Sequence, residues 1–241
     1  MSALQSYRVW DLGTRCFHWL NFLCVTGLMG VGLVILNADA LEVTNPGKVM
    51  LKSLHVWIGY VFALNLLWRF VWAFLGNRHA RLGALLPGGK GYARELGAYI
   101  KALRSGQRRA YLGHNPLGRI AVALLMLLLL VQAVTGLVLA GTDLFMPPIG
   151  GWIAEWIAAP GVDPATLLPY SPDMYDAAAY QEMRAFRAPF VEVHEISFFI
   201  LLLLVAVHIA AVIITEVREG GSLISAMFTG NKIHDTKPVD P

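Results

Sequence analysis

Four stretches of this sequence are apolar and long enough to cross a lipid bilayer, and no other feature limits the possible folds as strongly. They cover about 16–36, 53–75, 117–140 and 190–215 of the 241 residues, and a membrane-spanning helix needs about 20 residues. The chain is 56% hydrophobic and only 15% charged, which is typical of a membrane protein rather than of a soluble domain. We expect an all-α membrane protein, a bundle of four transmembrane helices that forms a single domain over residues 1–241.

The polar linkers between these stretches differ in charge. Residues 76–116 contain eight Lys and Arg residues against one acidic residue, whereas residues 141–189 contain six acidic residues and two Arg. The positive-inside rule places the basic linker 76–116 and both termini in the cytoplasm and the acidic linker 141–189 on the opposite side. Short helices are expected within these linkers, over about 92–103 and 152–158. The net charge of +3 is too small to indicate a nucleic-acid partner.

Four of the seven histidines lie inside the apolar stretches. His194 and His208 are 14 residues apart, which brings both rings to one helix face with a rise of roughly 21 Å between them. The directions of the four spans then pair His55 with His194 at the outer depth and His18 with His208 at the inner depth. Imidazole groups inside a membrane are costly and are usually functional. The sequence therefore predicts two histidine sites at two depths.

Two histidines at each depth favour haem, because bis-histidine ligation of a planar iron cofactor needs only two protein ligands. A structural zinc site would need four ligands in one place. Covalent haem attachment is excluded, since the two cysteines, Cys16 and Cys24, are not part of a CxxCH motif. The remaining alternative is that the histidines are hydrogen-bonded groups in the core of a helix bundle. Depth-matched pairs favour metal ligation by all four, which are His18, His55, His194 and His208.

Other residues near these histidines have two possible roles. Arg69 follows His55 by 14 residues, so it lies on the same face at the inner depth, where a haem propionate would supply the anion that a buried arginine needs. Arg15 is a second candidate for a propionate, or its side chain extends to the membrane surface. Glycines of the first and third spans either let a macrocycle approach the backbone or mediate helix contacts; they are Gly27, Gly30, Gly32 and Gly136.

Several motifs together resemble the b-type cytochrome subunit of membrane-bound nickel–iron hydrogenases, within the bacterial di-haem membrane cytochromes b. The resemblance runs from about Val9 to Gly230, and it includes the spacing of His194 and His208. The motifs are Arg15-Cys16-Phe17-His18-Trp19, His55 followed by Gly59, Arg69-Phe70-Val71-Trp72-Ala73-Phe74-Leu75-Gly76-Asn77-Arg78, Gly113-His114-Asn115-Pro116 and Thr135-Gly136. The family's haem ligands correspond to the same four histidines.

The resemblance implies an electron-transfer subunit of a quinone-linked oxidoreductase complex in the bacterial inner membrane. Such a subunit holds two haem b groups and connects a periplasmic hydrogenase small subunit with quinone near the inner haem. His114 and Asn115 lie at the depth where they would hydrogen-bond a quinone; alternatively, Asn115-Pro116 is a helix N-terminal cap. Electrons could flow in either direction.

The acidic linker 141–189 is longer and more acidic than the family pattern leads us to expect, which leaves the periplasmic partner open. A basic c-type cytochrome would fit such a surface as well as a hydrogenase does. One alternative function is therefore a quinol-oxidising cytochrome b that delivers electrons to a c-type cytochrome or another periplasmic acceptor. An alternative from another class is a haem-free transporter or assembly scaffold.

Overall fold

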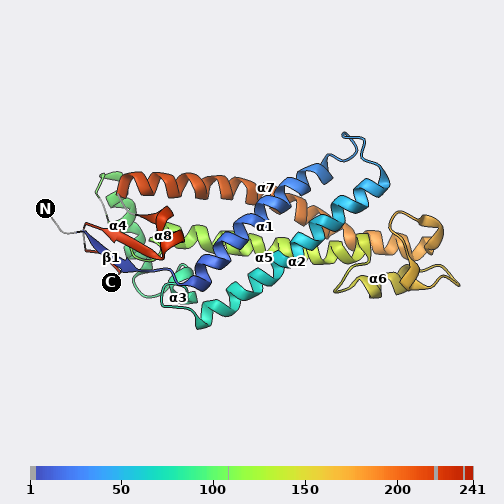
Figure 1. Ribbon diagram of the computed structural model, residues 1–241, viewed down its shortest axis with the longest axis horizontal. Helices are drawn as coiled ribbons and strands as arrows, with labels where there is room; N and C mark the ends of the chain where they lie inside the picture. The colour runs from blue at the N-terminus through green and yellow to red at the C-terminus, as the bar shows by residue number, and fades with distance from the viewer. Residues whose placement is uncertain (1–3, 108, 220–221, 236, 241) are drawn as a thin grey trace. The chain divides into compact units, whose positions relative to one another are not determined.

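The computed structural model describes residues 4–107, 109–219, 222–235 and 237–240 (Figure 1). Within this part of the chain, four helices are long and apolar enough to cross a membrane, which confirms the number of predicted spans. They are α1 (Leu12–Leu36), α2 (Asn45–Leu75), α5 (Pro116–Leu144) and α7 (Ala177–Glu219).

The helices are longer than the apolar stretches that predicted them. The last stretch was expected to begin at residue 190, after Pro189, but α7 begins at Ala177 and contains Pro189. Proline is tolerated within membrane helices because neighbouring groups satisfy the backbone carbonyl that it frees. Helix α2 likewise begins at Asn45 rather than at residue 53. In both helices the polar first turns continue the helix beyond its most apolar part.

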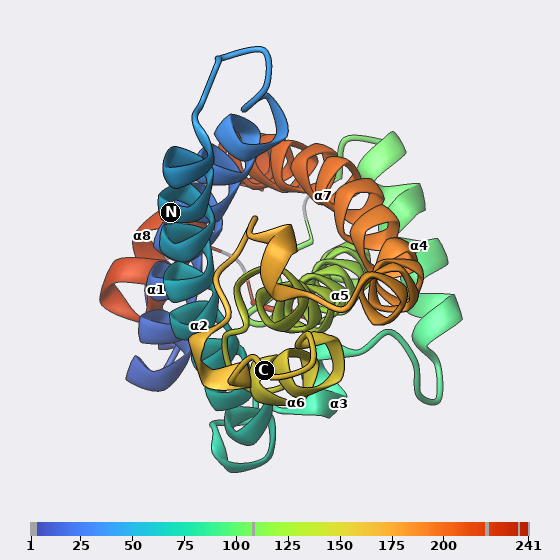
Figure 2. The same cartoon turned by 90° about the vertical axis from the view of Figure 1, so that its right-hand side faces the viewer.

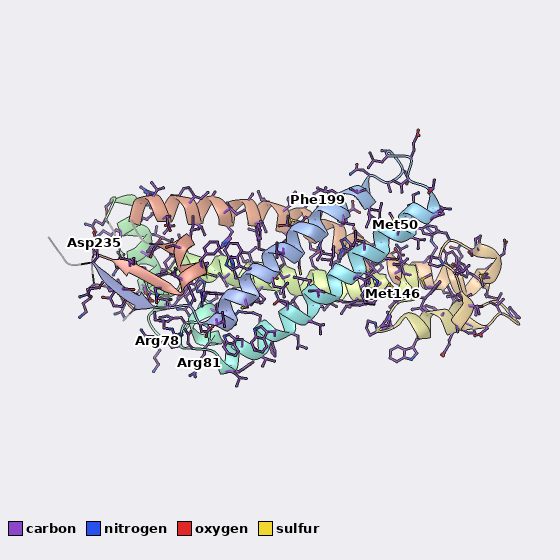
Figure 3. All side chains as sticks on the ribbon, viewed as in Figure 1. Met50, Arg78, Arg81, Met146, Phe199 and Asp235 are labelled. Atoms are coloured by element: carbon purple, nitrogen blue, oxygen red, sulfur yellow. The ribbon has the colours of Figure 1, made fainter. Side chains whose placement is uncertain are left out.

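The exteriors of these helices are apolar, as expected for surfaces that face lipid. Leu23 of α1, Phe70 of α2, Leu127 of α5 and Leu203 of α7 are all more than half exposed. Phe199, also on α7, is 49% exposed (Figure 3). Such surfaces would aggregate in water, whereas lipid tails cover them without cost.

Chain contacts divide the protein into two compact units, and each of the four long helices contributes to both. The first unit comprises residues 1–21, 65–127 and 201–241, and the second comprises residues 22–64 and 128–200.

A single carboxylate connects the beginning of α1 with the end of α2 in the first unit. Asp11 Oδ1 accepts hydrogen bonds from the backbone N–H of Thr14 at 2.8 Å and from Trp72 Nε1 at 2.9 Å, and Oδ2 accepts from the backbone N–H of Asn77 at 3.0 Å. Burial alone would raise the pKa of Asp11, but these hydrogen bonds lower it below its ordinary value. Close packing here also requires Gly13, because a Cβ at this position would lie 2.5 Å from the Trp72 ring.

The first unit contains two short strands that the all-α prediction missed. Strand β1 (Gln5–Arg8) pairs antiparallel with β2 (Asn231–His234), with Gln5 opposite His234 and Arg8 opposite Asn231 (Figure 1). The prediction of an all-α chain was therefore wrong in this detail. Each strand has only four residues, and the two lie at opposite ends of the sequence, so no local pattern indicated their pairing.

The basic linker folds within the first unit. Helix α4 (Tyr92–Arg104) confirms the helix expected over 92–103, and the shorter α3 (Leu82–Leu85) precedes it. Arg119 of α5 attaches this linker, since its guanidinium donates to the carbonyls of Gly83, at 2.9 Å, and Leu86. Other basic side chains stay exposed, among them Arg78 and Arg81, which project from the segment after α2 (Figure 3).

The acidic linker folds within the second unit. Helix α6 (Gly150–Ile157) confirms the short helix expected near 152–158, and the 3₁₀ turns η1 (Pro164–Thr166) and η2 (Pro172–Met174) follow it (Figure 2). Ile153, Ile157 and Met183 belong to one apolar cluster beneath these turns. Gly150 is required at the start of α6, because a Cβ there would overlap the Phe145 carbonyl at 2.1 Å. This linker is a folded surface rather than a loose loop.

The C-terminal helix α8 (Leu223–Thr229) completes the first unit and leads into β2. Trp19 of α1 donates from Nε1 to the Met227 carbonyl at 3.0 Å, and the backbone N–H groups of Val9 and Trp10 donate to the Gly230 carbonyl. The chain before α1 and the chain after α7 are thus fastened to each other.

We predict that Asp11→Ala destabilises the protein by about 1–3 kcal/mol, because it removes a helix cap and leaves two partly buried donors unsatisfied. Thermal unfolding in detergent measures the change. The matched control is Asp173→Ala, which removes an exposed carboxylate and should leave the melting temperature within the experimental error. Equal effects of the two substitutions would contradict the role given to Asp11.

Candidate functional site

His55 of α2 and His194 of α7 form a pair in the second unit, as the depth argument predicted. Their ring centroids are 6.3 Å apart, and the ring planes are inclined by 71°. Neither side chain is exposed, and within the described residues His55 Nδ1 is buried without a hydrogen-bond partner. Imidazoles that are partly buried inside a membrane are costly, above all when a buried ring nitrogen has no partner. The pair therefore indicates a site for a ligand that bonds to ring nitrogens.

Hydrogen bonds from α5 decide which nitrogen of His194 is available. His194 Nδ1 lies 2.8 Å from Thr135 Oγ1, and the same hydroxyl donates to the Val131 carbonyl at 2.7 Å. A hydroxyl has one proton to donate, so toward His194 it acts as an acceptor and Nδ1 carries the ring proton. The lone pair then lies on Nε2. Gln132 adds to this support by donating to the His194 carbonyl at 2.8 Å.

Two glycines leave space beside the two rings. A Cβ at Gly32 of α1 would lie 3.4 Å from His55 Cε1, and a Cβ at Gly136 of α5 would lie 3.4 Å from His194 Cε1. Any larger side chain at either position would therefore extend over a ring. Gly30 of α1 differs, since a Cβ there would meet nothing within 4 Å. The first two glycines keep open the volume around the histidine pair.

His18 of α1 and His208 of α7 both lie in the first unit. His18 packs edge-on against Trp19, with ring centroids 5.4 Å apart, and its Nδ1 is buried with no hydrogen-bond partner in the described part of the chain. Among the described residues, no ring contact like that between His55 and His194 joins His18 to His208. The two histidines that the sequence assigned to the inner depth thus belong to the same unit, and their pairing stays a prediction.

Arg69 lies in the first unit with one part of its guanidinium unsatisfied. The side chain is only 5% exposed, and its Nη2 donates to the Ala80 carbonyl at 3.0 Å. Its guanidinium also lies over the Phe17 ring, 5.7 Å from the centroid. Among the described residues Arg69 Nη1 has no acceptor, so the arrangement suits an anionic ligand group.

Arg15 has a protein partner, since Nη1 donates to the carbonyl of Phe228 at the end of α8. That bond attaches α1 to α8 and uses one of the five N–H donors of the guanidinium. Its Nε is buried and unpartnered in the part of the chain that the structure describes. A role toward a ligand thus remains a prediction for Arg15, beside its structural role.

The first unit also contains a pocket of about 270 Å³. His114 lies in its wall, with a buried Nδ1 that is unpartnered within the described residues and a ring 5.1 Å from that of Trp10. The other lining residues include charged, titratable and small side chains: Arg78, His79, Ala84, Glu95, Tyr111, Gly113, Pro116, Arg119 and Asp240. The pocket therefore offers hydrogen-bonding groups of both charges around a neutral histidine.

Asn115 is a helix cap, as the alternative interpretation of this residue required. Its Oδ1 accepts from the backbone N–H of Gly118 at 2.7 Å, and its Nδ2 donates to the Tyr99 hydroxyl at 2.9 Å. These bonds fix the beginning of α5 and connect it to α4. Asn115 is absent from the pocket lining, so His114 is the stronger candidate of the two for a ligand contact.

The C-terminal segment forms hydrogen bonds with the loop that precedes His114, and the sequence did not predict this contact. The Asp240 carboxylate accepts from the backbone N–H groups of Leu112 at 2.6 Å and Gly113 at 2.8 Å. The buried Lys232 donates from Nζ to the carbonyls of Tyr111 and Gly113, both at 3.1 Å. The sequence shows only that Asp240 and Lys232 are polar. No local pattern connects these two residues with a loop more than 100 residues away.

Comparison with known proteins identifies the family. The family model for prokaryotic cytochrome b561 matches residues 9–230. The chain belongs to this family. It is therefore a membrane cytochrome of the b type, and b-type cytochromes use haem b. No solved structure matches the chain significantly.

Curated relatives of this cytochrome are named "Probable Ni/Fe-hydrogenase B-type cytochrome subunit". The relative from Rhizobium leguminosarum bv. viciae is 27% identical, over 95% of this chain and 90% of its own length. The relative from Cupriavidus necator is 26% identical, over 95% of this chain and 87% of its own. The relative from Azotobacter vinelandii is 31% identical over a shorter region, 60% of this chain and 65% of its own.

The His55–His194 pair of the cytochrome fits the axial ligands of a haem. Metal–imidazole bonds of about 2 Å on each side of one iron take up roughly 4 Å of the separation between the rings. The remainder of the 6.3 Å between centroids corresponds to the distances from each bonding nitrogen to the centre of its ring. Within the described residues, no group of three or more His, Cys, Asp and Glu could hold a metal ion.

We predict that Gly32→Val lowers the haem b bound per chain, because the new side chain occupies the space beside the His55 ring. The matched control is Gly30→Val on the same helix, where a Cβ meets no neighbour. Haem content is measured by pyridine haemochrome in purified protein, and circular dichroism establishes equal helix content. If both variants retain full haem, the space beside Gly32 is not needed for the cofactor.

Burial, together with the nearby positive charges of Lys232 and Arg69, lowers the pKa of His114 from 6.5 to about 3. The folded protein thus holds His114 neutral, and below pH 6.5 the unfolded chain binds a proton that the folded chain does not bind. This residue therefore costs stability as the pH falls from about 6.5 toward 3. Between pH 7 and pH 5 the unaltered protein should therefore lose roughly 1–2 kcal/mol more unfolding free energy than the His114→Gln variant. We predict a correspondingly smaller fall of the melting temperature in the variant over this pH range. An identical loss in both proteins would contradict the neutral state.

Proposed function

We propose that this cytochrome carries electrons across the membrane between a periplasmic hydrogenase and the quinone pool, through two haem b groups. The outer haem is held by His55 and His194, and the inner one by His18 and His208. The observation that supports this most directly is the partly buried His55–His194 pair, with ring centroids 6.3 Å apart and a proton placed on His194 Nδ1 by Thr135. A haem in such a site supplies one-electron chemistry at its iron.

The chain's residues hold and tune these groups. Thr135 fixes the His194 ring by a hydrogen bond, which is the usual role of such a partner to a ligating histidine. Gly32 and Gly136 leave the volume that the macrocycle needs. In the first unit, Arg69 offers its unsatisfied Nη1 to a propionate of the inner haem. A positive charge that is buried near a haem favours the reduced state.

A partner outside the membrane would bind on the folded acidic linker. Four of its acidic side chains are exposed, together with Trp152 at 72% and Leu168 at 59%; these carboxylates are Glu155, Asp163, Asp173 and Glu182. Exposed aromatic and apolar groups within a charged rim are typical of interfaces. The names of the curated relatives favour a hydrogenase as this partner. The acidic charge supports a basic c-type cytochrome as the alternative, with the cytochrome oxidising quinol.

Quinone would bind in the pocket beside His114. The neutral ring of His114 can donate a hydrogen bond to a quinone carbonyl, and the titratable groups Glu95, His79 and Asp240 line the same pocket. Quinone reduction consumes protons, and these groups offer a route by which protons reach the pocket from water. If the basic linker is cytoplasmic, as the positive-inside rule predicts, these protons come from the cytoplasm. The same parts serve the reverse reaction, quinol oxidation.

The proposal predicts two b haems per chain, and it predicts that each histidine pair holds one of them. Pyridine haemochrome and a reduced-minus-oxidised spectrum of the purified protein measure both. His194→Ala should remove only the outer haem and His208→Ala only the inner one, with the other spectrum intact. One haem in the unaltered protein would refute the two-site assignment. No haem at all would favour an assembly scaffold or a transporter instead.

Reactivity with quinone is predicted to depend on His114. His114→Phe should slow the oxidation of the reduced haems by a soluble quinone analogue at least about 10-fold, with both haem spectra unchanged. Asn115→Asp serves as the control, because a carboxylate oxygen preserves the cap on Gly118. Normal quinone kinetics in the His114 variant would move the quinone site away from this pocket.

A further inference from the structure

Two cations share one carboxylate in the second unit. Lys52 Nζ of α2 lies 2.6 Å from Asp143 Oδ2, and Arg187 Nη2 of α7 lies 2.6 Å from Asp143 Oδ1 on α5. The three side chains are between 16% and 26% exposed, so each is largely removed from solvent. The ring of Tyr170 covers the ammonium, 5.3 Å from its centroid. We call these three residues, Lys52, Asp143 and Arg187, the ion triad.

The ion triad has one positive charge too many. Two cations and one anion leave a formal charge of +1 at a place where an uncompensated charge is costly. Arg187 Nε shows where the compensation is missing, because it is buried and has no acceptor among the described residues. A guanidinium binds carboxylates and phosphates well because several of its N–H groups point the same way. An anionic group that reaches Arg187 Nε would satisfy both the charge and the donor.

Helix register relates the ion triad to the outer haem site. Lys52 precedes His55 by three residues on α2, and Arg187 precedes His194 by seven on α7. Seven residues are close to two full turns and three are close to one, so each cation lies on the same helix side as a histidine of the pair. On α5, Asp143 follows Gly136 by seven residues, and Gly136 faces the His194 ring. All three helices thus place a member of the triad one or two turns from the histidine pair.

We propose that the ion triad is the binding site for a propionate of the outer haem, with Arg187 Nε as a donor to its carboxylate. This inference rests on the proposed outer haem at His55 and His194. One or two turns of helix are about 5–11 Å, which is the scale on which propionates extend from a haem iron. The triad would hold the porphyrin in one rotational orientation. Its excess charge would also raise the midpoint potential of the outer haem, because a nearby positive charge stabilises the added electron.

The experiment compares Arg187→Gln with Arg184→Gln in the purified full-length cytochrome. Arg184 lies on the same helix and is exposed, so its substitution removes the same charge without touching the triad. Redox titration followed optically gives the midpoint potentials, and the spectrum lost in His194→Ala identifies the outer haem. Resonance Raman spectroscopy of the propionate bending mode reports the hydrogen bond itself, independently of electron-transfer activity.

In Arg187→Gln we expect the ratio of oxidised to reduced outer haem at a given potential to rise tenfold. This corresponds to a fall of about 59 mV in the midpoint potential of a one-electron centre. The propionate band should shift as well. The inner haem and the Arg184→Gln protein should show neither change. Unchanged potential and band in Arg187→Gln would overturn the inference. A shifted potential with an unchanged band would also overturn it, because the charge would then act without binding.

Arg187→Lys provides a second test if Arg187→Gln does not fold, since it keeps the charge and removes Nε. We expect a shifted propionate band with a midpoint potential close to that of the unaltered protein, and an unshifted band would overturn the proposal. An anionic lipid is the competing occupant. If removal of lipid leaves both the potential and the propionate band of the unaltered protein unchanged, the lipid interpretation fails. If removal of lipid changes the potential and Raman shows no propionate contact, our proposal fails. A protein with a single haem would instead refute the proposed two-haem function.

Discussion

Polar groups buried between apolar helices need partners, and this requirement governs the rest of the structure. Outside the helices lipid provides no hydrogen bonds, so each polar side chain inside must be satisfied by another helix or by a bound group. Gln132 and Thr135 of α5 are satisfied by α7 and by their own helix. Nδ1 of His18, Nδ1 of His55 and Nη1 of Arg69 are not, within the described residues. These three residues are among those that we propose hold a haem.

The same reasoning separates structural from functional polar residues. Asp11 and Asn115 each use both side-chain atoms in bonds that cap a helix and connect it to another segment. Their polar side-chain atoms therefore serve the fold rather than a ligand. His114, in contrast, presents a neutral ring in a pocket wall with one nitrogen unsatisfied among the residues described. Sequence position alone treats Asn115 and His114 as equal candidates, and hydrogen bonding distinguishes them.

Attachment of the two chain ends has consequences for the proposed quinone site. The segment around β2 and Asp240 supplies acceptors and donors to the backbone of residues 111–113, directly before His114. The pocket wall is thus built partly by the C-terminal residues of the first unit. Within the second unit, the ion triad connects α2, α5 and α7 near the folded acidic linker.

The sequence alone determined the number of spans, the helices over 92–103 and 152–158, and the pairing of His55 with His194, because each of these follows from local apolarity or helical period. It also indicated Arg69 from its spacing to His55. Only the tertiary structure decided that β1 pairs with β2, that Thr135 sets the tautomer of His194, and that Lys52, Asp143 and Arg187 share one site. These features join residues from 44 to more than 200 positions apart, and the pairing of such remote groups depends on packing between helices, which no local pattern records.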